Sequence, residues 1–369
     1  MKKILFITLC MIVIFNILPF GLWRGLDDSR FDTVDALARL KFYLIAPYDG
    51  KNIRTKIERL GPSWMQEQIK GNLASISPSH TSKESLDSYM SQFSKEDLQK
   101  FLLVRFTIKK GEIIQYPQTI QQFQGRLTAL HHALEILLKE NLLPEGLDFI
   151  VCINDKIFEG YRGEIPIFVF SKDVSDARQR NLILIPDGMN LSRWAYHYPT
   201  IRFANFIFPW AKKKNTLLWR GSNTNPIRER VVQMTLPFLD AVITDGRDQS
   251  YMIPEYQIQF KYLLSLDGIS STWPGLLWKL ASNSVTFKQA SSHQQWYYGG
   301  IKPGVHYVEV QKDLSDLEAE YQWAESHPQE AQIISDNAQA FVRDNLTYEE
   351  MLHYLARVFN AYKKIPITA

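Results

Sequence analysis

The stretch NTLLWRGSNTNPIRERVV, from Asn215 to Val232, decides the fold class. An apolar run ends at Trp219, a polar turn follows, and Pro226 opens a segment with a helical pattern. A short continuous apolar run is typical of a strand buried on both faces, and such strands occur mainly in parallel sheets. This strand, turn and helix therefore predict one unit of an α/β fold.

Seven further apolar runs alternate with helical patterns in the same way. In chain order they are DFIVCI, IPIFVF, NLILIP, DAVIT, KYLLSLDG, SVTFKQ and HYVEV. The alternation predicts parallel sheets and the α/β class. Around these runs we expect a hairpin turning at Lys110–Gly111, a helix capped by Ser94, an amphipathic helix over Arg126–Asn141, and a helical C-terminus of three segments from Ser315 to Lys364.

The composition is that of an ordinary globular protein with room for two domains: 369 residues, of which 45% are hydrophobic and 22% charged. The 42 basic and 39 acidic residues leave a formal net charge of +3. Proteins that bind nucleic acid gather positive charge, so this balance predicts no nucleic-acid partner.

The N-terminal segment MKKILFITLCMIVIFNILPFGLW carries two lysines and then an apolar run from Ile4 to Phe20. The run is at the short end of what spans a bilayer. A cleaved signal peptide is the alternative, although no small-residue cleavage site follows. We therefore expect residues 1–25 to form a membrane anchor or signal segment, with the anchor preferred.

Asp155 is the first candidate for catalysis, because it follows the run DFIVCI. In open parallel sheets, ligands bind beyond the carboxyl ends of the strands. A carboxylate at such a place is well positioned to act as a general base. The alternative is a loop aspartate that caps a turn, and position alone favours this alternative.

The turn after the run TLLWRG offers groups that suit an anion. Gly221 lets the backbone approach a ligand closely, and Ser222 and the amides after it can point at a phosphate. Arg220 precedes the turn, and Arg228 falls in the first turn of the expected helix, where a guanidinium can pair with a phosphate. Solvated arginines at an ordinary strand-to-helix turn are an equally good interpretation.

A second strand, turn and helix follow in KYLLSLDGISSTWPG. After Gly268 come Ser270, Ser271 and Thr272, whose hydroxyls and amides precede a helix and suit a diphosphate. Two such turns favour a nucleotide-type ligand. The sequence has no Cys/His cluster with metal spacing and no Asp-x-Asp after a strand. We therefore expect no metal and no cofactor, with positive side chains and helix N-termini neutralising the diphosphate.

Six blocks of the chain resemble consecutive blocks of a known family. They are IPIFVFSKD, NLILIPDG, LLWRGSNTNPIRERVV, FKYLLSLDGISSTWPGLLWKLASNSVTFKQ, WYYGGIKPGVHYVEVQKDLSDLEAEYQWA and AQAFVRDNLTYEEMLHYL. The family is glycosyltransferase family 90, which holds capsule-associated proteins, Rumi-type protein O-glucosyltransferases and bacterial lipopolysaccharide-modifying members. The resemblance runs from about Phe101 to the C-terminus.

The resemblance implies a GT-B-like architecture, in which two Rossmann-like domains face a central cleft. We assign residues 26–100 to a stem and helical region, residues 101–190 to an acceptor-side domain, residues 191–345 to a nucleotide-sugar-binding domain, and residues 346–369 to a C-terminal helix. The resemblance also implies an inverting, metal-independent transfer from a UDP-sugar.

Matched position by position, the family's catalytic aspartate falls on Asp155. Its RGS turn falls on Arg220 to Ser222, its donor-binding arginine on Arg228, and its second turn on Gly268 to Thr272. Many members carry an arginine just after that second turn, where this chain reads WPG. Lys279, one helical turn further on, is our candidate to replace that arginine.

We therefore expect a glycosyltransferase that moves glucose or xylose from a UDP-sugar to a hydroxyl of a glycan, a lipid-linked saccharide, lipopolysaccharide or a protein. The alternative is a non-catalytic glycan-binding or assembly-scaffold relative with a decayed donor site, which the missing arginine supports. With only two cysteines, the chain resembles bacterial members more than lumenal ones. We expect it at a bacterial inner membrane, with the cytoplasmic face favoured because UDP-sugars are expected there.

Overall fold

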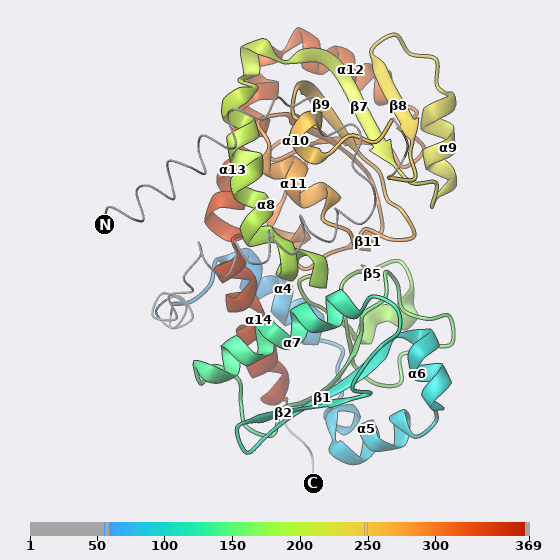
Figure 1. Cartoon of the computed structure of the whole chain (residues 1–369), viewed down its shortest axis with the longest axis vertical. Helices are drawn as coiled ribbons and strands as arrows, with labels where there is room; N and C mark the ends of the chain where they lie inside the picture. The colour runs from blue at the N-terminus through green and yellow to red at the C-terminus, as the bar shows by residue number, and fades with distance from the viewer. Residues whose placement is uncertain (1–54, 56–58, 247, 249, 366–369) are drawn as a thin grey trace. The chain divides into compact units, whose positions relative to one another are not determined.

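The computed structural model describes residue 55 and residues 59–365, apart from residues 247 and 249. The chain divides into two units, Met1–Tyr48 and Asp49–Ala369. The first unit lies outside the described residues, and every described helix and strand belongs to the second. The second unit is a mixed α/β fold with two five-stranded sheets and a two-stranded ribbon (Figure 1).

The first sheet is mixed. Its strands are β1 (Leu103–Lys109), β2 (Glu112–Tyr116), β3 (Asp148–Cys152), β4 (Ile167–Val169) and β6 (Leu182–Leu184). Their order is β2-β1-β3-β4-β6, with β1 antiparallel to both of its neighbours and β3, β4 and β6 parallel. The hairpin predicted at Lys110–Gly111 is confirmed, because Lys109 pairs with Glu112 across that turn.

The second sheet is parallel throughout. Its strands are β7 (Lys214–Gly221), β8 (Leu239–Ile243), β9 (Phe260–Ser265), β10 (Val285–Gln289) and β12 (Val308–Val310). Their order is β12-β10-β9-β7-β8. Counted along the chain within this sheet, that is the order 2-1-3-4-5 of doubly wound sheets. All eight apolar runs of the sequence form strands, and the expected α/β class with parallel strands is confirmed.

The helices surround these sheets. They are α4 (Ser63–Leu73), α5 (Lys83–Met90), α6 (Lys95–Phe101), α7 (Gln124–Lys139), α8 (Gly188–Ile207), α9 (Pro226–Gln233), α10 (Pro254–Gln257), α11 (Gly275–Ala281), α12 (Leu317–Ser326), α13 (Pro328–Asn345) and α14 (Tyr348–Lys363), with short 3-10 turns η2 (Pro78–Thr81), η3 (Ala177–Asn181), η4 (Trp210–Lys212) and η5 (Tyr298–Gly300). The capping box of Ser94 and Asp97 opens α6, and the predicted C-terminal segments are α12, α13 and α14. The amphipathic helix is confirmed as α7, two residues earlier at each end than expected.

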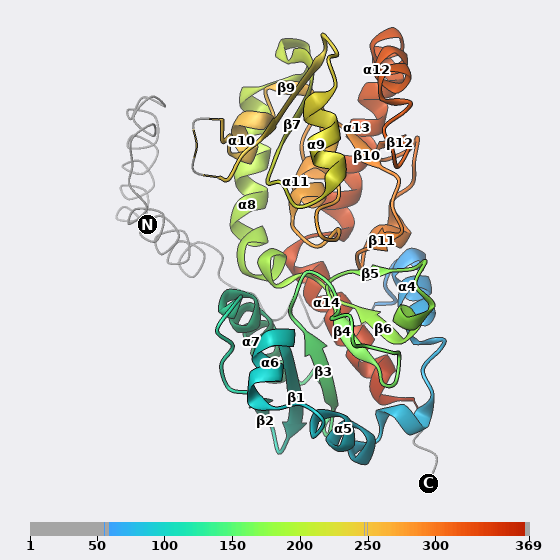
Figure 2. The same cartoon turned by 90° about the vertical axis from the view of Figure 1, so that its right-hand side faces the viewer.

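A small ribbon and the last helix are among the connections between the halves of this unit. The ribbon of β5 (Lys172–Asp173) and β11 (His293–Gln294) pairs a segment near the first sheet with one that follows β10. The last helix, α14, returns to the first sheet (Figures 1 and 2), where the ring of Phe359 lies 4.6 Å from that of Phe149 and 5.2 Å from that of Phe168. The aromatic core of the first sheet is therefore completed by the end of the chain.

The expected domain boundaries remain predictions. The strands of the first sheet fall within residues 101–190 and those of the second within residues 191–345, while α8 spans the expected boundary at residue 190. The structure describes only part of the expected stem and does not reach the last four residues of the expected C-terminal helix.

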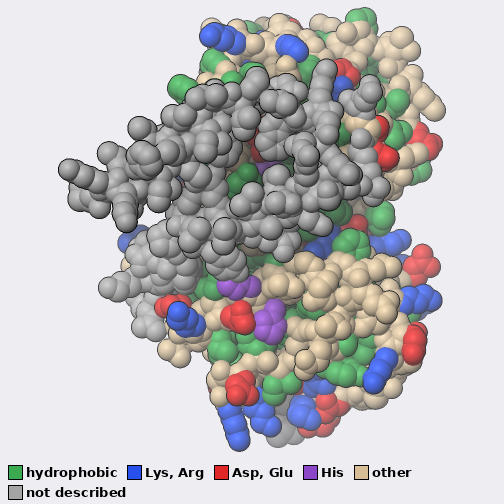
Figure 3. Space-filling view, viewed as in Figure 1, with side chains coloured by type: hydrophobic (Ala, Val, Ile, Leu, Met, Phe, Trp, Pro, Cys, Tyr) green, Lys and Arg blue, Asp and Glu red, His purple; other side chains and the backbone are tan. Residues whose placement is uncertain are grey.

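The structure corrects the expected membrane association. Among the residues that the structure describes, none of the helices has the length and apolar character needed to cross a bilayer. The segment 1–25, on which that expectation rested, lies outside the described residues. On the face drawn in Figure 3, acidic and basic side chains are interspersed over the described surface.

Candidate active site

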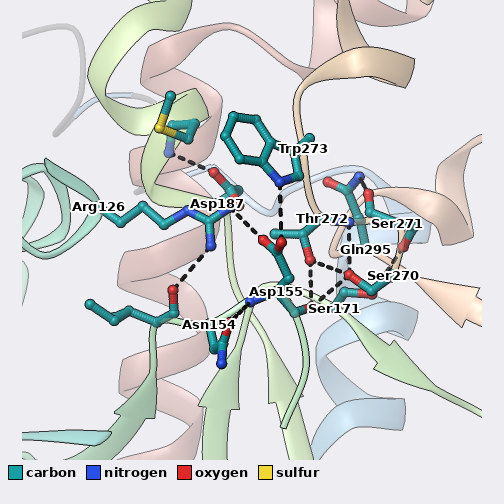
Figure 4. A network of polar contacts seen from close by, with 12 residues as sticks. Arg126, Asn154, Asp155, Ser171, Asp187, Ser270, Ser271, Thr272, Trp273 and Gln295 are labelled. Carbon is teal, nitrogen blue, oxygen red and sulfur yellow. Dashed lines mark hydrogen bonds and ion pairs between the residues drawn. The ribbon is translucent and has the colours of Figure 1, made fainter. Parts of the chain in front are cut away.

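Asp155 lies three residues beyond the end of β3, and its side chain is held at both oxygens (Figure 4). Oδ1 accepts a hydrogen bond of 2.7 Å from Nη2 of Arg126, and Oδ2 accepts one of 3.3 Å from the indole Nε1 of Trp273. The residue is 9% exposed. A carboxylate has about four lone-pair positions, so two donors leave room for an incoming hydroxyl.

Arg126 is the buried cation of this site. It lies in the first turn of α7, its side chain is fully buried, and Nη1 donates to the carbonyl oxygen of Ile153 at 3.1 Å. Its Nη2 also lies 3.7 Å from Oδ2 of Asp187. Asp187 caps α8 by accepting from the amide of Met189, and burial raises the pKa of its carboxyl. One guanidinium therefore pairs with two carboxylates, and its hydrogen bond to Asp155 holds that carboxylate in place.

The starts of α7 and α8 touch at this cation. A Cβ on Gly188 would lie 2.7 Å from the Cα of Arg126, which is closer than packed atoms allow. Glycine at the first position of α8 thus lets the two helices approach, and this approach brings Asp187 to the guanidinium.

The loop after β9 is fastened to the chain around Asp155. The hydroxyls of Ser270 and Thr272 donate to the Asp155 carbonyl oxygen at 2.6 and 2.7 Å. Ser271 and Ser171 share a hydroxyl contact of 2.9 Å. The structure therefore brings three of the expected diphosphate ligands together with the expected base, but their hydroxyls bind protein. Whether they also contact a donor stays a prediction.

Arg228 bridges the loops that follow β7 and β9. Its Nε donates to the carbonyl oxygen of Asp267 at 2.9 Å, Nη1 to that of Ser222 at 2.8 Å, and Nη2 to that of Leu266 at 3.1 Å. A Cβ on Gly268 would lie 3.0 Å from Nη2 of Arg228, so only glycine leaves the guanidinium its place. Three of the five guanidinium N–H groups are used in this way, and two are left.

The first turn of α9 adds a second link between these loops. Pro226 occupies the first helical position, as expected, and Asn225 caps the helix by accepting from the amide of Ile227 at 3.1 Å. The same side chain donates from Nδ2 to the carbonyl oxygen of Gly268 at 2.9 Å. The two turns singled out in the sequence therefore form one connected structure.

This structure lies at the switch point of the second sheet. The strand order places β7 beside β9, and the chain continues from β7 to one side, to β8, and from β9 to the other, to β10. Doubly wound sheets bind ligands at the carboxyl ends of the strands at such a point. Arg228 lies there, bonded to the residues after both strands.

Lys279 is a second buried cation close to Arg228. Its Nζ lies 4.6 Å from the ring of Trp278 and 3.4 Å from the carbonyl oxygen of Gly275. Burial, with the charge of Arg228 adding to it, lowers the pKa of Lys279 to about 7. Burial also lowers the pKa of Arg228, against the opposing charge of Asp267. Within the described part of the chain no carboxylate pairs with Lys279, so an anion would stabilise both charges.

Arg220 and Gly221 were expected to face a phosphate, but their contacts in the structure are with protein side chains. The Arg220 guanidinium pairs with the carboxylate of Asp240 on β8, with Nη1 2.8 Å from Oδ1 and Nη2 2.9 Å from Oδ2. A Cβ on Gly221 would lie 2.8 Å from the ring of Trp219, so this glycine makes room for an indole. Arg220 is thus held by Asp240, and its contact with a donor stays a prediction.

A cavity of about 690 Å³ opens along the carboxyl ends of β9, β10 and β12. Its size is that of a ligand site. Its lining consists of Asp173, Asn225, Ile227, Arg230, Asp267, Gln289, Ala290, Ser291, Ser292, His293, Gln311, Lys312 and Asp313. Sequence reasoning missed most of these residues. The signal was present, because Asp267, Gln289 and Gln311 each come at or just after the end of a strand.

The described residues do not form a metal-binding cluster. Among residues 59–365, apart from 247 and 249, no group of three or more His, Cys, Asp or Glu side chains could hold a metal ion. The buried cations near the switch point include Arg228 and Lys279.

Comparison with known proteins adds a family and several relatives. Residues 83–368 match the family model described as Glycosyl transferase family 90. The chain is 31% identical over 173 residues to Protein O-glucosyltransferase 2 of Danio rerio, a match that covers 43% of this chain and 34% of that protein. It is 30% identical over 188 residues to O-glucosyltransferase LpsA of Dichelobacter nodosus, covering 48% of this chain and 56% of that protein.

A longer match is weaker in identity. The chain is 22% identical over 299 residues to Protein O-glucosyltransferase 1 of Homo sapiens, which covers 73% of this chain and 74% of that protein. The chain thus spans less than two thirds of the length of the Danio and Dichelobacter proteins, and more of the human protein.

Proposed function

The chain belongs to glycosyl transferase family 90, and from this premise we propose that it transfers glucose or xylose from a UDP-sugar to a hydroxyl acceptor on a glycan, lipopolysaccharide or protein. We propose that the transfer inverts the anomeric centre and needs no metal ion. The names of the relatives, which are O-glucosyltransferases, support the class of reaction. The two sheets, each with parallel strands, support a GT-B-like arrangement.

The single observation that carries the proposal is the meeting of Asp155 with the loop after β9. The first sheet supplies a carboxylate at the end of β3, and the second supplies a loop whose hydroxyls reach the same residue. A transferase needs a base for the acceptor and a charged site for the leaving diphosphate close to each other. Here the base and the switch point are joined by one short loop.

Asp155 is the proposed base. Arg126 and Trp273 each bind one of its oxygens, which fixes the plane of the carboxylate. In the reaction, Asp155 takes the proton of the acceptor hydroxyl while the hydroxyl oxygen attacks the anomeric carbon. The bond from that carbon to the diphosphate oxygen breaks on the opposite face, UDP leaves, and the configuration is inverted.

Arg228 and Lys279 are the proposed diphosphate ligands. Both are cations whose pKa burial lowers, which means that their charged forms are destabilised without an anion. The negative charge that gathers on the leaving UDP would be stabilised here without solvent reorganisation. The cavity that Asp267 lines, next to its bond with Arg228, has the volume for the nucleoside.

A UDP-release screen tests this function. The purified chain is incubated with UDP-glucose, UDP-xylose and UDP-galactose, with and without EDTA, and UDP is measured. We expect release from glucose or xylose donors that EDTA does not reduce. Loss of release with EDTA would refute the metal-independent mechanism.

A thermal-shift titration with UDP separates the enzyme from a scaffold relative. A ligand that binds the folded state raises the melting temperature by mass action. We expect a rise at millimolar UDP without metal. A chain that shows neither a shift nor UDP release would be the non-catalytic relative, and the proposed function would fall.

A further inference from the structure

The loop from Gly268 to Trp273 buries polar side chains and exposes apolar ones. Ser270, Ser271 and Thr272 are 7%, 9% and 0% exposed, whereas Ile269 and Trp273 are 48% and 50% exposed. This is the reverse of the usual pattern for a loop, and it leaves a half-exposed aromatic ring next to Asp155.

The buried hydroxyls make this loop a fixed support. Ser270 and Thr272 bind the Asp155 carbonyl oxygen, Ser271 contacts Ser171 at 2.9 Å, and Gln295 donates to the carbonyl oxygen of Ser271. Trp273 therefore extends from a loop that is hydrogen-bonded to both halves of the unit, which lowers the entropy cost of ordering its side chain when a ligand binds.

The indole of Trp273 lies directly at the proposed base. Its Nε1 donates to Oδ2 of Asp155 at 3.3 Å, and the guanidinium carbon of Arg126 lies 5.2 Å from the ring centre (Figure 4). The ring is thus oriented at its edge by Asp155 and contacted by Arg126, and half of its surface still faces solvent.

We propose that Trp273 is the platform on which a sugar ring of the acceptor stacks, so that the acceptor of this enzyme is a saccharide. This inference rests on the proposed function, because it takes Asp155 as the base that receives the acceptor proton.

The geometry places the acceptor ring at the indole. A hydroxyl that gives its proton to Asp155 must come within about 3 Å of a free lone pair of that carboxylate. The carbon that bears the hydroxyl then lies close to the indole, because the indole N–H is bonded to Oδ2 of the same carboxylate. The C–H groups of a pyranose face are slightly positive and the face of an aromatic ring is slightly negative, so the two attract.

A saccharide gains more from this platform than a serine would. A serine hydroxyl brings one methylene group and no ring to the indole, whereas a pyranose brings a whole face of C–H groups. Removing the aromatic ring should therefore weaken saccharide binding by roughly tenfold, the size of a good aromatic contact, and should leave a serine acceptor nearly unaffected.

Direct binding provides the test, because it does not depend on turnover. Methyl β-D-glucopyranoside and methyl β-D-galactopyranoside are titrated into the full chain and followed by saturation-transfer NMR. We expect transfer to the ring protons of at least one glycoside, reduced roughly tenfold in Trp273→Ala and largely kept in Trp273→Phe. Phe206, which is 79% exposed on α8, provides the matched control as Phe206→Ala, which should bind like the wild type.

Turnover separates the two roles of the indole. With a glycoside as acceptor, Trp273→Ala should raise the acceptor KM about tenfold while the KM for the UDP-sugar in hydrolysis by water stays within about twofold of the wild type. Trp273→Phe removes the N–H bond to Asp155 but keeps a ring, so it should keep the acceptor KM and lower kcat for both reactions.

The outcomes are distinct. Equal glycoside binding by wild type and Trp273→Ala, or no glycoside binding by the wild type, would overturn the platform. Binding that Trp273→Ala loses, in a chain that releases no UDP from any donor, would overturn the proposed function and leave the saccharide site standing.

Discussion

The buried guanidinium of Arg126 provides a prediction whose size can be worked out from the structure. Its side chain is fully buried between the carboxylates of Asp155 and Asp187, whose side chains are 12% and 0% exposed. In Arg126→Met the volume is nearly kept, but both carboxylates lose their cation. Removing one partner of a buried pair costs about 3–5 kcal/mol, because the remaining charge stays desolvated. We expect a loss of this size in the free energy of unfolding at pH 7.

The loss should depend on pH, and Asp187 sets the sign. Burial raises the pKa of this carboxyl, and the charge of Arg126 opposes that rise. Without Arg126 the folded-state pKa rises further, so the folded protein binds a proton that the unfolded chain releases above about pH 4. The stability of Arg126→Met should therefore fall as pH rises from 5 to 7, by up to about 1.4 kcal/mol per pH unit.

Urea unfolding at pH 5, 6 and 7 measures both effects. The double variant Arg126→Met with Asp187→Asn should lose most of the pH dependence, because the amide does not titrate. The matched control is Arg178→Met, whose pair with Asp176 is similarly short at 2.8 Å, although the Arg178 side chain is 55% exposed. An exposed pair contributes about 0–1 kcal/mol. If Arg126→Met lost no more than this control, our account of a buried charge cluster would be wrong.

Two further predictions concern the switch point. UDP-glucose, whose diphosphate does not titrate near neutrality, should bind with proton uptake by Lys279, so its affinity should fall by up to about tenfold per pH unit above pH 7. Calorimetry in two buffers of different ionisation enthalpy measures the proton uptake, and Lys279→Met should remove the pH dependence. Gly268→Ala places a Cβ 3.0 Å from Nη2 of Arg228 and 2.9 Å from Oγ1 of Thr224. It should lower the free energy of unfolding by about 1–3 kcal/mol and weaken UDP-glucose binding, whereas the control Gly111→Ala, at a hairpin with open space around the glycine, should leave binding unchanged.

The strands were predictable because their signal is local. Continuous apolar runs form strands wherever both faces of a sheet are covered, and all eight runs do so in this chain. The turn chemistry was equally local, since Pro226 starts α9 as its type requires. Both features depend on residues that are neighbours along the chain, so the sequence was enough to predict them.

The directions of the polar side chains were not predictable, because their partners are distant in sequence. Arg126 reads as one more charged residue of an amphipathic helix, yet it is buried against carboxylates that follow β3 and β6. Arg220 and Arg228 belong to one motif, but the first pairs with Asp240 on the neighbouring strand, whereas the second bonds to carbonyl oxygens of two loops. Whether an arginine pairs with a neighbour or points at a ligand depends on the sheet order.

The hydroxyls after β9 show the same limit. Ser270 and Thr272 were expected to hold a diphosphate at a helix N-terminus, but their bonds go to the carbonyl of a residue in the other half of the unit. Their sequence pattern predicts a polar turn, and only the packing of the two sheets decides what that turn binds.

The central claim is that Asp155 is the base of a transfer from a UDP-sugar, and Asp155→Asn tests it most directly. The amide keeps the shape of the side chain but does not take up the acceptor proton. Transfer from UDP-glucose or UDP-xylose should drop by about 100-fold or more, while the UDP dissociation constant should stay within about threefold of the wild type, because the proposed diphosphate ligands are Arg228 and Lys279. Transfer that persists in this variant at more than a tenth of the wild-type rate would contradict the account.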